Sequence, residues 1–217
     1  MTRTELLAGQ LTALGLEVEP QAQERLLQFL DELLRWNRRI NLTAITDPEE
    51  GIEKHLVDSL TLLPLLQERE RLLDLGSGGG FPGIPCLLAR PGLQVTTVDA
   101  VQKKIHFQRH VARLLGTRGL QPLHCRAEDL PRVLGEDGRF DLVVSRAFTS
   151  LGGFLALGLP CLAQGGRLVA MKGAEGRQEL DHAQPEIASL GLVCSELREL
   201  ELPLSRARRT LLVFERA

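Results

Sequence analysis

Aromatic residues and cysteines are scarce in this chain of 217 residues. It contains no tyrosine, one tryptophan and seven phenylalanines, so we do not expect a sheet whose aromatic side chains stack on RNA bases. The four cysteines are far apart and form no C-x-x-C pair, which disfavours a zinc site. We expect buried free thiols in a reducing compartment and no bound metal.

Long apolar runs and a basic charge excess are also absent. No apolar run approaches the roughly 20 residues that cross a membrane, and the segment Met1–Glu5 lacks the design of a signal peptide. We therefore expect a cytoplasmic protein without membrane contact, and nothing in the chain suggests more than a monomer. The formal net charge of −2 differs from that of proteins that wrap nucleic acid. Any RNA contact must therefore come from local clusters.

A glycine-rich turn is the most informative feature that is present. It follows the apolar run Leu72–Leu75 and precedes a predicted helix. Glycines allow positive φ or the close approach of a ligand, and the free N–H groups of the next helix point toward that ligand. The pattern D-x-G-x-G-x-G is complete, formed by Asp74, Gly76, Gly78 and Gly80. It resembles motif I of class I S-adenosylmethionine (SAM) methyltransferases.

Two other nucleotide-binding motifs fit this turn less well. The dinucleotide fingerprint, counted from Gly76, requires a glycine where Phe81 stands; counted from Gly78 it finds Gly83 but misplaces the first turn. A P-loop requires a lysine after the glycines, and none follows. A nicotinamide dehydrogenase is therefore disfavoured, while a turn without any ligand stays open as an alternative.

The chain divides into a helical part over residues 1–70 and an alternating part over residues 71–217. In the first part, leucines recur at helical spacing over Leu26–Leu34, and Pro20 and Asp47-Pro48 mark helix starts. The predicted strands of the second part are Leu72–Leu75, Val95–Asp99, Leu120–His124, Phe140–Ser145 and Arg167–Met171. Helices are expected over 82–90, 101–115, 128–134, 151–162 and 178–190, and two closing strands over 192–202 and 210–215. This order predicts an α/β fold with a mostly parallel sheet, an antiparallel closing strand and a helical N-terminal extension, as one domain.

Ligands of such sheets lie at the carboxyl ends of the strands, which selects a few residues independently of any motif. Asp99 lies 23 positions after Gly76 (99 − 76), where a carboxylate holds a ribose diol. Ala127 and Glu128 follow the third strand, Arg146 follows the fourth and Lys172 follows the fifth. The alternative roles are a helix cap for Asp99, a plain helix start at 127–128, a paired structural arginine and a surface lysine.

Several polar and basic clusters allow both structural and functional interpretations. Arg206, Arg208 and Arg209 form either a solvated turn or a phosphate-binding patch, and Arg35, Arg38 and Arg39 end a helix, where cations suit the dipole. Asn41 and Thr43 either close a turn or contact a substrate. His55 and Asp58 lie three residues apart on one helical face, where they can pair with each other or face a substrate.

Several segments together resemble the RsmG (GidB) family, over nearly the whole chain. They are Trp36-Asn37, Asn41–Ala44, His55–Leu60, Gly76–Pro85, Val98–Ala100, Lys103-Lys104, Val144–Phe148 and Met171–Gly173. The glycine motif alone indicates a methyltransferase. The Asn-Leu-Thr and His-Leu-Val-Asp-Ser segments make the resemblance specific.

The resemblance implies a class I SAM-dependent methyltransferase (Rossmann-like) fold that methylates N7 of one guanine in the 530 loop of 16S ribosomal RNA. The partner would be this RNA or the small ribosomal subunit. Carried over by motif, the SAM contacts fall on Gly76, Phe81, Ala127, Glu128 and Arg146. Gly78 and Gly80 belong to the same cofactor-binding turn as Gly76. The general logic of class I enzymes adds a ribose contact by Asp99.

The chemistry of guanine N7 requires no acid or base. N7 carries an exposed lone pair, and no Asn/Asp-Pro-Pro-Tyr/Phe tetrad for exocyclic amines is present. Catalysis is therefore expected to be alignment, with Arg146, Lys172, His55 and Asp58 as positioning candidates. The RNA-binding candidates are Lys172, Arg206, Arg208, Arg209, Asn41 and Thr43. The alternative functions are a small-molecule methyltransferase with the same core and a non-catalytic SAM or nucleotide sensor.

Overall fold

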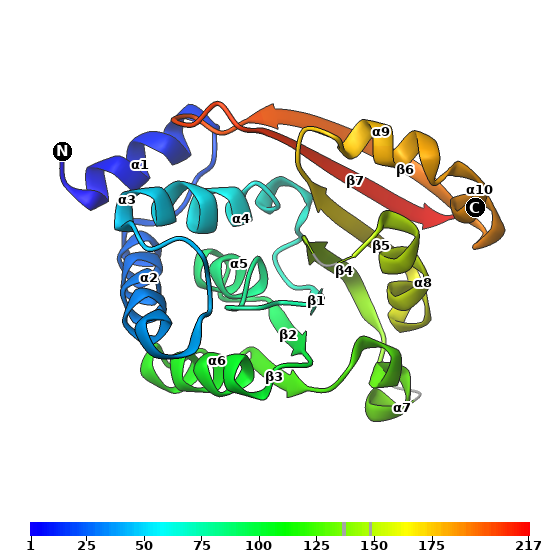
Figure 1. Cartoon of the computed structure of the whole chain (residues 1–217), viewed down its shortest axis with the longest axis horizontal. Coiled ribbons are helices and arrows are strands. Elements are labelled where there is room, and N and C mark those ends of the chain that lie inside the picture. Colours follow the sequence, from blue (N-terminus) through cyan, green and yellow to red (C-terminus); the bar gives the residue numbers. More distant parts are fainter. Residues whose placement is uncertain (136–137, 148) are drawn as a thin grey trace.

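A seven-stranded sheet with helices on both faces forms the centre of the protein (Figure 1). The computed structural model describes residues 1–135, 138–147 and 149–217. The strand order is β3-β2-β1-β4-β5-β7-β6, with β1 between β2 and β4. The sequence therefore runs outward from β1 in one direction and then restarts beside β1 at β4, which is where such sheets bind ligands.

The strands confirm the expected fold class. They are β1 (Arg71–Leu75), β2 (Gln94–Asp99), β3 (Leu120–His124), β4 (Phe140–Arg146), β5 (Leu162–Lys172), β6 (Leu192–Glu201) and β7 (Arg208–Arg216). The first five pair in parallel, and β7 is antiparallel to both of its neighbours, β5 and β6. The sheet is thus mostly parallel with an antiparallel closing strand.

Two elements of the core differ from the sequence prediction. Strand β5 begins at Leu162, five residues earlier than predicted, because Leu162 pairs with Phe140 before the register shifts. The helix predicted over 178–190 is two helices, α9 (Gly176–His182) and α10 (Gln184–Ser189). The break lies at Ala183, two residues before Pro185, because proline lacks the N–H group that would continue the hydrogen bonding of α9.

The extension contains two long helices and one composite helix. They are α1 (Arg3–Ala13), α2 (Pro20–Ile40) and a run formed by α3 (Pro48–Gly51), the π-helical η1 (Ile52–Val57) and α4 (Asp58–Leu60). Helix α2 begins at Pro20 as predicted, and the Asp47 side chain caps α3 by accepting from the Glu50 N–H at 2.8 Å. A short 3₁₀ turn, η2 (Leu63–Leu65), leads toward β1.

The two faces of the sheet carry different helices. Apolar residues alternate along the strands between two buried clusters, so Leu72 and Val144 belong to one cluster and Leu73 and Val143 to the other. The first cluster includes residues of the extension, of α5 (Gly83–Ala89) and of α6 (Gln102–Leu114). The second includes residues of α7 (Leu130–Leu134), α8 (Leu151–Gly158), α9 and α10. The extension therefore contributes to the same buried core as the sheet.

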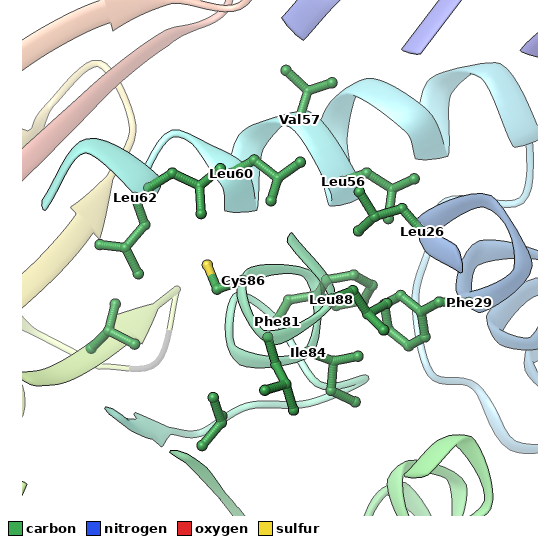
Figure 2. Packing of buried hydrophobic residues seen from close by; sticks show 14 of the residues in the cluster. Leu26, Phe29, Leu56, Val57, Leu60, Leu62, Phe81, Ile84, Cys86 and Leu88 are labelled. Atoms are coloured by element: carbon green, nitrogen blue, oxygen red, sulfur yellow. The ribbon is translucent and has the colours of Figure 1, made fainter. Parts of the chain in front are cut away.

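Figure 2 shows how the extension packs on α5. Phe29 of α2 lies beside Phe81, with 5.2 Å between the ring centroids. Leu56 and Leu60 line the side of the composite helix that faces α5, and Val57 points away from α5.

No helix in the described part of the chain is long and apolar enough to cross a bilayer.

Candidate functional site

The glycine turn after β1 is held in a tight, left-handed geometry. Gly76, Gly78 and Gly80 have φ of 70°, 56° and 97°, which residues with a Cβ rarely adopt. A Cβ on Gly80 would lie 2.3 Å from Ile84 Cδ1, whereas one on Gly78 would meet nothing within 4 Å. Gly80 therefore closes the turn against α5, and Gly78 faces open space.

The Asp74 carboxyl fixes the start of α5. It is fully buried, and its Oδ2 accepts from the Gly83 N–H at 2.8 Å. Burial raises the pKa of Asp74 well above its usual value. Its other oxygen, Oδ1, has no hydrogen-bond partner in the described part of the protein. The aspartate of the motif therefore stabilises the turn by binding the first residue of the helix that follows it.

A first hollow of about 470 Å³, the strand-end hollow, lies beside this turn. Its lining residues are Gly76, Val98, Asp99, Ala100, Lys104, Cys125, Arg126, Ala127, Glu128 and Ala147. The structure thus brings together four residues that the sequence analysis assigned to the cofactor. These four follow three different strands, which meet at one edge of the sheet as expected for a parallel arrangement.

The Asp99 side chain lies at the rim of the strand-end hollow and also supports the backbone. Its Oδ2 accepts from the Gly78 N–H at 3.0 Å, and its Oδ1 accepts from the Val101 N–H at 2.8 Å, just before α6. Lys104 Nζ lies 3.4 Å from Oδ2. The capping role is therefore present, and it orients the carboxylate that lines the hollow.

A second hollow of about 470 Å³, the Arg146 hollow, contains all four positioning candidates. Its lining residues are Ile45, Lys54, His55, Asp58, Arg146, Ala147, Met171, Lys172, Gly173, Glu179 and Arg209. Ala147, with a positive φ of 51°, lines both hollows. The two hollows therefore meet at the end of β4.

Asp58 joins two arginines from β4 and β7, which both lie beside the carboxyl end of β5. Its Oδ2 accepts from Arg146 Nη1 at 3.2 Å and its Oδ1 from Arg209 Nε at 2.8 Å. Arg146 Nη1 also donates to the Lys54 carbonyl at 3.0 Å. Burial lowers the pKa of Arg146, and the Asp58 charge opposes that effect. The ion-pair network links η1–α4, β4 and β7.

His55 contacts Thr43 in the structure, and Asp58 pairs with the arginines, so the expected His55–Asp58 pair is replaced. His55 Nε2 lies 2.8 Å from Thr43 Oγ1, and Nδ1 has no hydrogen-bond partner among the described residues. Burial, followed by the nearby Arg146 charge, lowers the pKa of His55 to about 4. The imidazole is therefore neutral at neutral pH.

The buried Phe81 ring contacts both His55 and Arg146. It stacks on His55, with 4.6 Å between centroids, and Arg146 Cζ lies 5.0 Å from its centroid. Only 5% of Phe81 is exposed. Its side chain therefore connects the glycine turn to the Arg146 hollow without lining either hollow.

Lys172 has a carboxylate partner that the sequence analysis did not find. Its Nζ lies 2.7 Å from Glu179 Oε2 and donates to the Thr149 carbonyl at 3.2 Å. Glu179 lies in α9, and no pattern in the sequence connects it with the end of β5. The positive charge of Lys172 is therefore largely neutralised within the protein.

The RNA-binding candidates are divided by the structure. Thr43 forms a hydrogen bond with His55, which lines the Arg146 hollow, and Arg209 lines the same hollow. Asn41 ends α2 in a left-handed conformation, with φ 49°. Arg206 pairs with the exposed Glu201 at 2.8 Å, and Arg208 lines a separate hollow on the β6–β7 hairpin. The last residue of the segment 144–148, Phe148, lies outside the described residues.

Comparison with known families identifies the chain. The family model described as rRNA small subunit methyltransferase G (GidB) matches residues 22–209. The chain belongs to this family. A ribosomal RNA small subunit methyltransferase G of Syntrophotalea carbinolica is 50% identical over 95% of this chain and 94% of the relative. Its counterpart in Geobacter sulfurreducens is 48% identical over 91% of this chain and 90% of the relative.

Solved structures of low sequence identity share the fold. M. jannaschii TYW2 in complex with AdoMet is 13% identical, with a TM-score of 0.59 over 75% of this chain and 76% of that chain. A SAM-dependent methyltransferase of Thiobacillus denitrificans in complex with S-adenosylhomocysteine is 15% identical, with a TM-score of 0.54 over 74% of this chain and 91% of that chain. With the family match, the fold makes this protein a class I methyltransferase.

Proposed function

We propose that the protein transfers the methyl group of SAM to N7 of a guanine in the 530 loop of 16S ribosomal RNA. The observation that carries the proposal is the family match over residues 22–209, which spans every residue lining both hollows. The curated relatives bear the name of a small-subunit rRNA methyltransferase. The acting species is the monomer, and its partner is 16S rRNA or the small subunit.

The strand-end hollow would receive SAM. The chain supplies the backbone of the glycine turn at Gly76, which Gly78 and Gly80 shape, the carboxylate of Asp99 for the ribose, and the segment Ala127-Glu128. Two solved structures of this fold were determined with AdoMet or S-adenosylhomocysteine, which supports this assignment. Arg146, with its guanidinium over the buried Phe81 ring, would complete the contact where the two hollows meet, and no metal is required.

The Arg146 hollow would receive the target guanine. The N7 lone pair attacks the methyl carbon in line with the breaking carbon–sulfur bond, and the positive charge moves from sulfur to the guanine ring. S-Adenosylhomocysteine leaves without any proton transfer. The protein therefore has to align the two reactants, which by itself supplies a large part of the rate.

The charges of the Arg146 hollow suit this reaction. A cation aimed at N7 would oppose the positive charge that develops there. The charge of Arg146 is offset by Asp58, and that of Lys172 by Glu179. His55, with a pKa of about 4, is neutral and a weak base. These residues therefore position the guanine and the donor without acid–base chemistry.

The test is methylation of small ribosomal subunits that lack the modification, with radiolabelled SAM. We expect label in 16S rRNA at one guanine of the 530 loop, where borohydride reduction and aniline cleave the chain at N7-methylguanosine. Naked 16S rRNA in parallel shows which assembly state is the substrate. Binding of S-adenosylhomocysteine without label in any RNA would support a sensor instead, and label only in a small molecule would overturn the RNA assignment.

A further inference from the structure

The C-terminal end of α2 carries a cluster of basic residues outside both hollows. Arg35, Trp36, Arg38, Arg39 and Ile40 line a hollow of about 420 Å³ at this end. We call the first four residues the α2-end patch. Its three arginines lie within five positions of a chain whose net charge is −2. The cluster is therefore a local feature and does not reflect a basic protein.

Two of the three arginines have no counter-charge among the residues that the structure describes. Arg35 Nη2 pairs with Glu32 Oε2 at 2.5 Å, and the same Glu32 oxygen lies 2.9 Å from His110 Nε2. Arg38 and Arg39 are exposed, and within the described ranges neither has an ion pair or a side-chain hydrogen bond. The helix dipole favours cations here, but adjacent like charges repel each other. An external anion would remove that repulsion.

Trp36 gives the patch a rigid aromatic base. Its ring lies 5.6 Å from that of Phe107 and 5.0 Å from that of His110, both in α6. Trp36 itself is half-buried. An aromatic ring held beside arginines suits a nucleic acid strand, because bases stack on such rings while guanidinium groups bind phosphates.

A chain of hydrogen bonds connects the end of α2 with the Arg146 hollow. Asn37, between the patch residues, accepts with Oδ1 from the N–H groups of Leu42 at 2.6 Å and Thr43 at 2.9 Å. Thr43 in turn contacts His55, which lines the Arg146 hollow. Figure 1 shows this end of α2 beside α6, with the following loop leading back to α3. A strand bound at the patch is therefore held on the helix whose Asn37 orients Thr43, the hydrogen-bond partner of His55 in the Arg146 hollow.

We propose that the α2-end patch binds the sugar–phosphate backbone of the RNA substrate next to the target guanine. Arg38 and Arg39 pair with phosphates, and Trp36 packs against a neighbouring nucleotide. The site rests on the proposed function for the identity of the RNA. It deepens that function by placing affinity for the substrate in the extension, away from the reacting atoms.

The test compares two double variants with equal loss of charge. Arg38→Ala/Arg39→Ala removes the patch cations. The control, Arg69→Ala/Arg118→Ala, removes two exposed arginines that precede β1 and β3, at the opposite edge of the sheet from the glycine turn. Circular dichroism and S-adenosylhomocysteine affinity verify that both variants fold and bind the donor.

The readouts are binding of 16S rRNA at several salt concentrations and the emission of Trp36, the only tryptophan in the chain. RNA is expected to quench Trp36 in the wild type. The patch variant is expected to lose about tenfold in affinity and to show a salt slope smaller by about 1.4–1.8, since two phosphate contacts are lost. Its rate at saturating substrate should equal that of the wild type. The control should resemble the wild type in all respects.

The outcomes separate this inference from the proposed function. If the wild type methylates 16S rRNA and the patch variant binds and quenches as the wild type does, the patch proposal fails alone. If the wild type transfers no label but binds RNA through Arg38 and Arg39, the proposed function fails and the patch stands. Weaker binding of assembled subunits with unchanged binding of naked RNA would assign the patch to a protein partner and overturn the proposal.

Discussion

The two hollows that meet at Ala147 are built in different ways. Apart from Lys104 of α6, the strand-end hollow is lined by residues at the ends of β1, β2, β3 and β4 or within four positions after them. The Arg146 hollow collects side chains from Ile45 to Arg209, and its walls depend on ion pairs between distant elements. The strand-end hollow, the proposed donor half, is thus a property of local chain geometry, and the Arg146 hollow, the proposed acceptor half, is a property of long-range charge pairing. Changes to each half should therefore have different consequences.

The largest effect is expected from Asp58→Ala, in the acceptor half. The change leaves Arg146 and Arg209 buried or half-buried without their shared carboxylate. Such a loss costs about 3–5 kcal/mol of unfolding free energy, measured by urea denaturation. Asp31→Ala is the control, because Asp31 pairs with Arg3 at the surface, with 58% of its side chain exposed. Equal losses in the two variants would contradict the role given to the buried network.

The next effect is the pH dependence due to His55. Its pKa is about 4 in the folded protein and 6.5 in the unfolded chain, so the unfolded state binds more protons between these values. The free energy of unfolding should therefore fall as the pH drops from 6.5 to 4, by roughly 3 kcal/mol in all.

His55→Gln isolates this contribution of the acceptor half. The variant should lose less stability than the wild type over the same pH window, measured by denaturation at each pH. His182→Gln, at an exposed histidine, should retain the pH slope of the wild type. Parallel curves for wild type and His55→Gln would mean that His55 is not held neutral.

A smaller loss of stability is expected from Gly80→Ala, in the donor half. The new Cβ meets Ile84 at 2.3 Å and the residue keeps a φ of 97°, which costs about 2 kcal/mol. Calorimetry should show weaker binding of S-adenosylhomocysteine. Gly9→Ala, in α1 with nothing within 4 Å of the new Cβ, should instead stabilise by about 1 kcal/mol. Unchanged donor binding in Gly80→Ala would remove the turn from the donor site.

The smallest effect is expected from Arg206→Ala, outside both hollows. Arg206 pairs with Glu201, but 74% of its side chain is exposed, and such pairs contribute less than about 1 kcal/mol. Thermal denaturation at low and high salt checks this. A loss comparable to that of Asp58→Ala would show that the hairpin charges also hold the acceptor half together.

Much of the fold could be predicted from local patterns. The ends of β3 follow from the apolar run over 120–124. The glycine turn follows from Gly78-Gly79-Gly80, a run that indicates a sharp backbone turn. The start of α2 at Pro20 has an equally local cause. Pro185 also marks the break between α9 and α10, although the sequence analysis expected one helix over 178–190.

For the proposed acceptor half, several of the lining residues could be predicted from the sequence, but their ion-pair partners could not. His55, Asp58, Arg146 and Lys172 were selected from position and resemblance, and the structure places them in one hollow. Their partners were not predictable, since Arg209 lies 151 residues from Asp58. A charged residue carries no local sign of which opposite charge it will meet after folding.

The sequence alone determined the family and the place of the glycine turn, because positive φ and strand alternation depend on neighbouring residues. Only the tertiary structure decided that Asp58 binds Arg146 and Arg209, that Glu179 neutralises Lys172, and that His55 stays neutral. Those features arise when the N-terminal extension packs against the sheet that includes the C-terminal hairpin and excludes water from these charges. The proposed binding site of the methyl donor is thus formed by local chain geometry. The proposed binding site of the guanine forms only when distant parts of the chain meet in the folded protein.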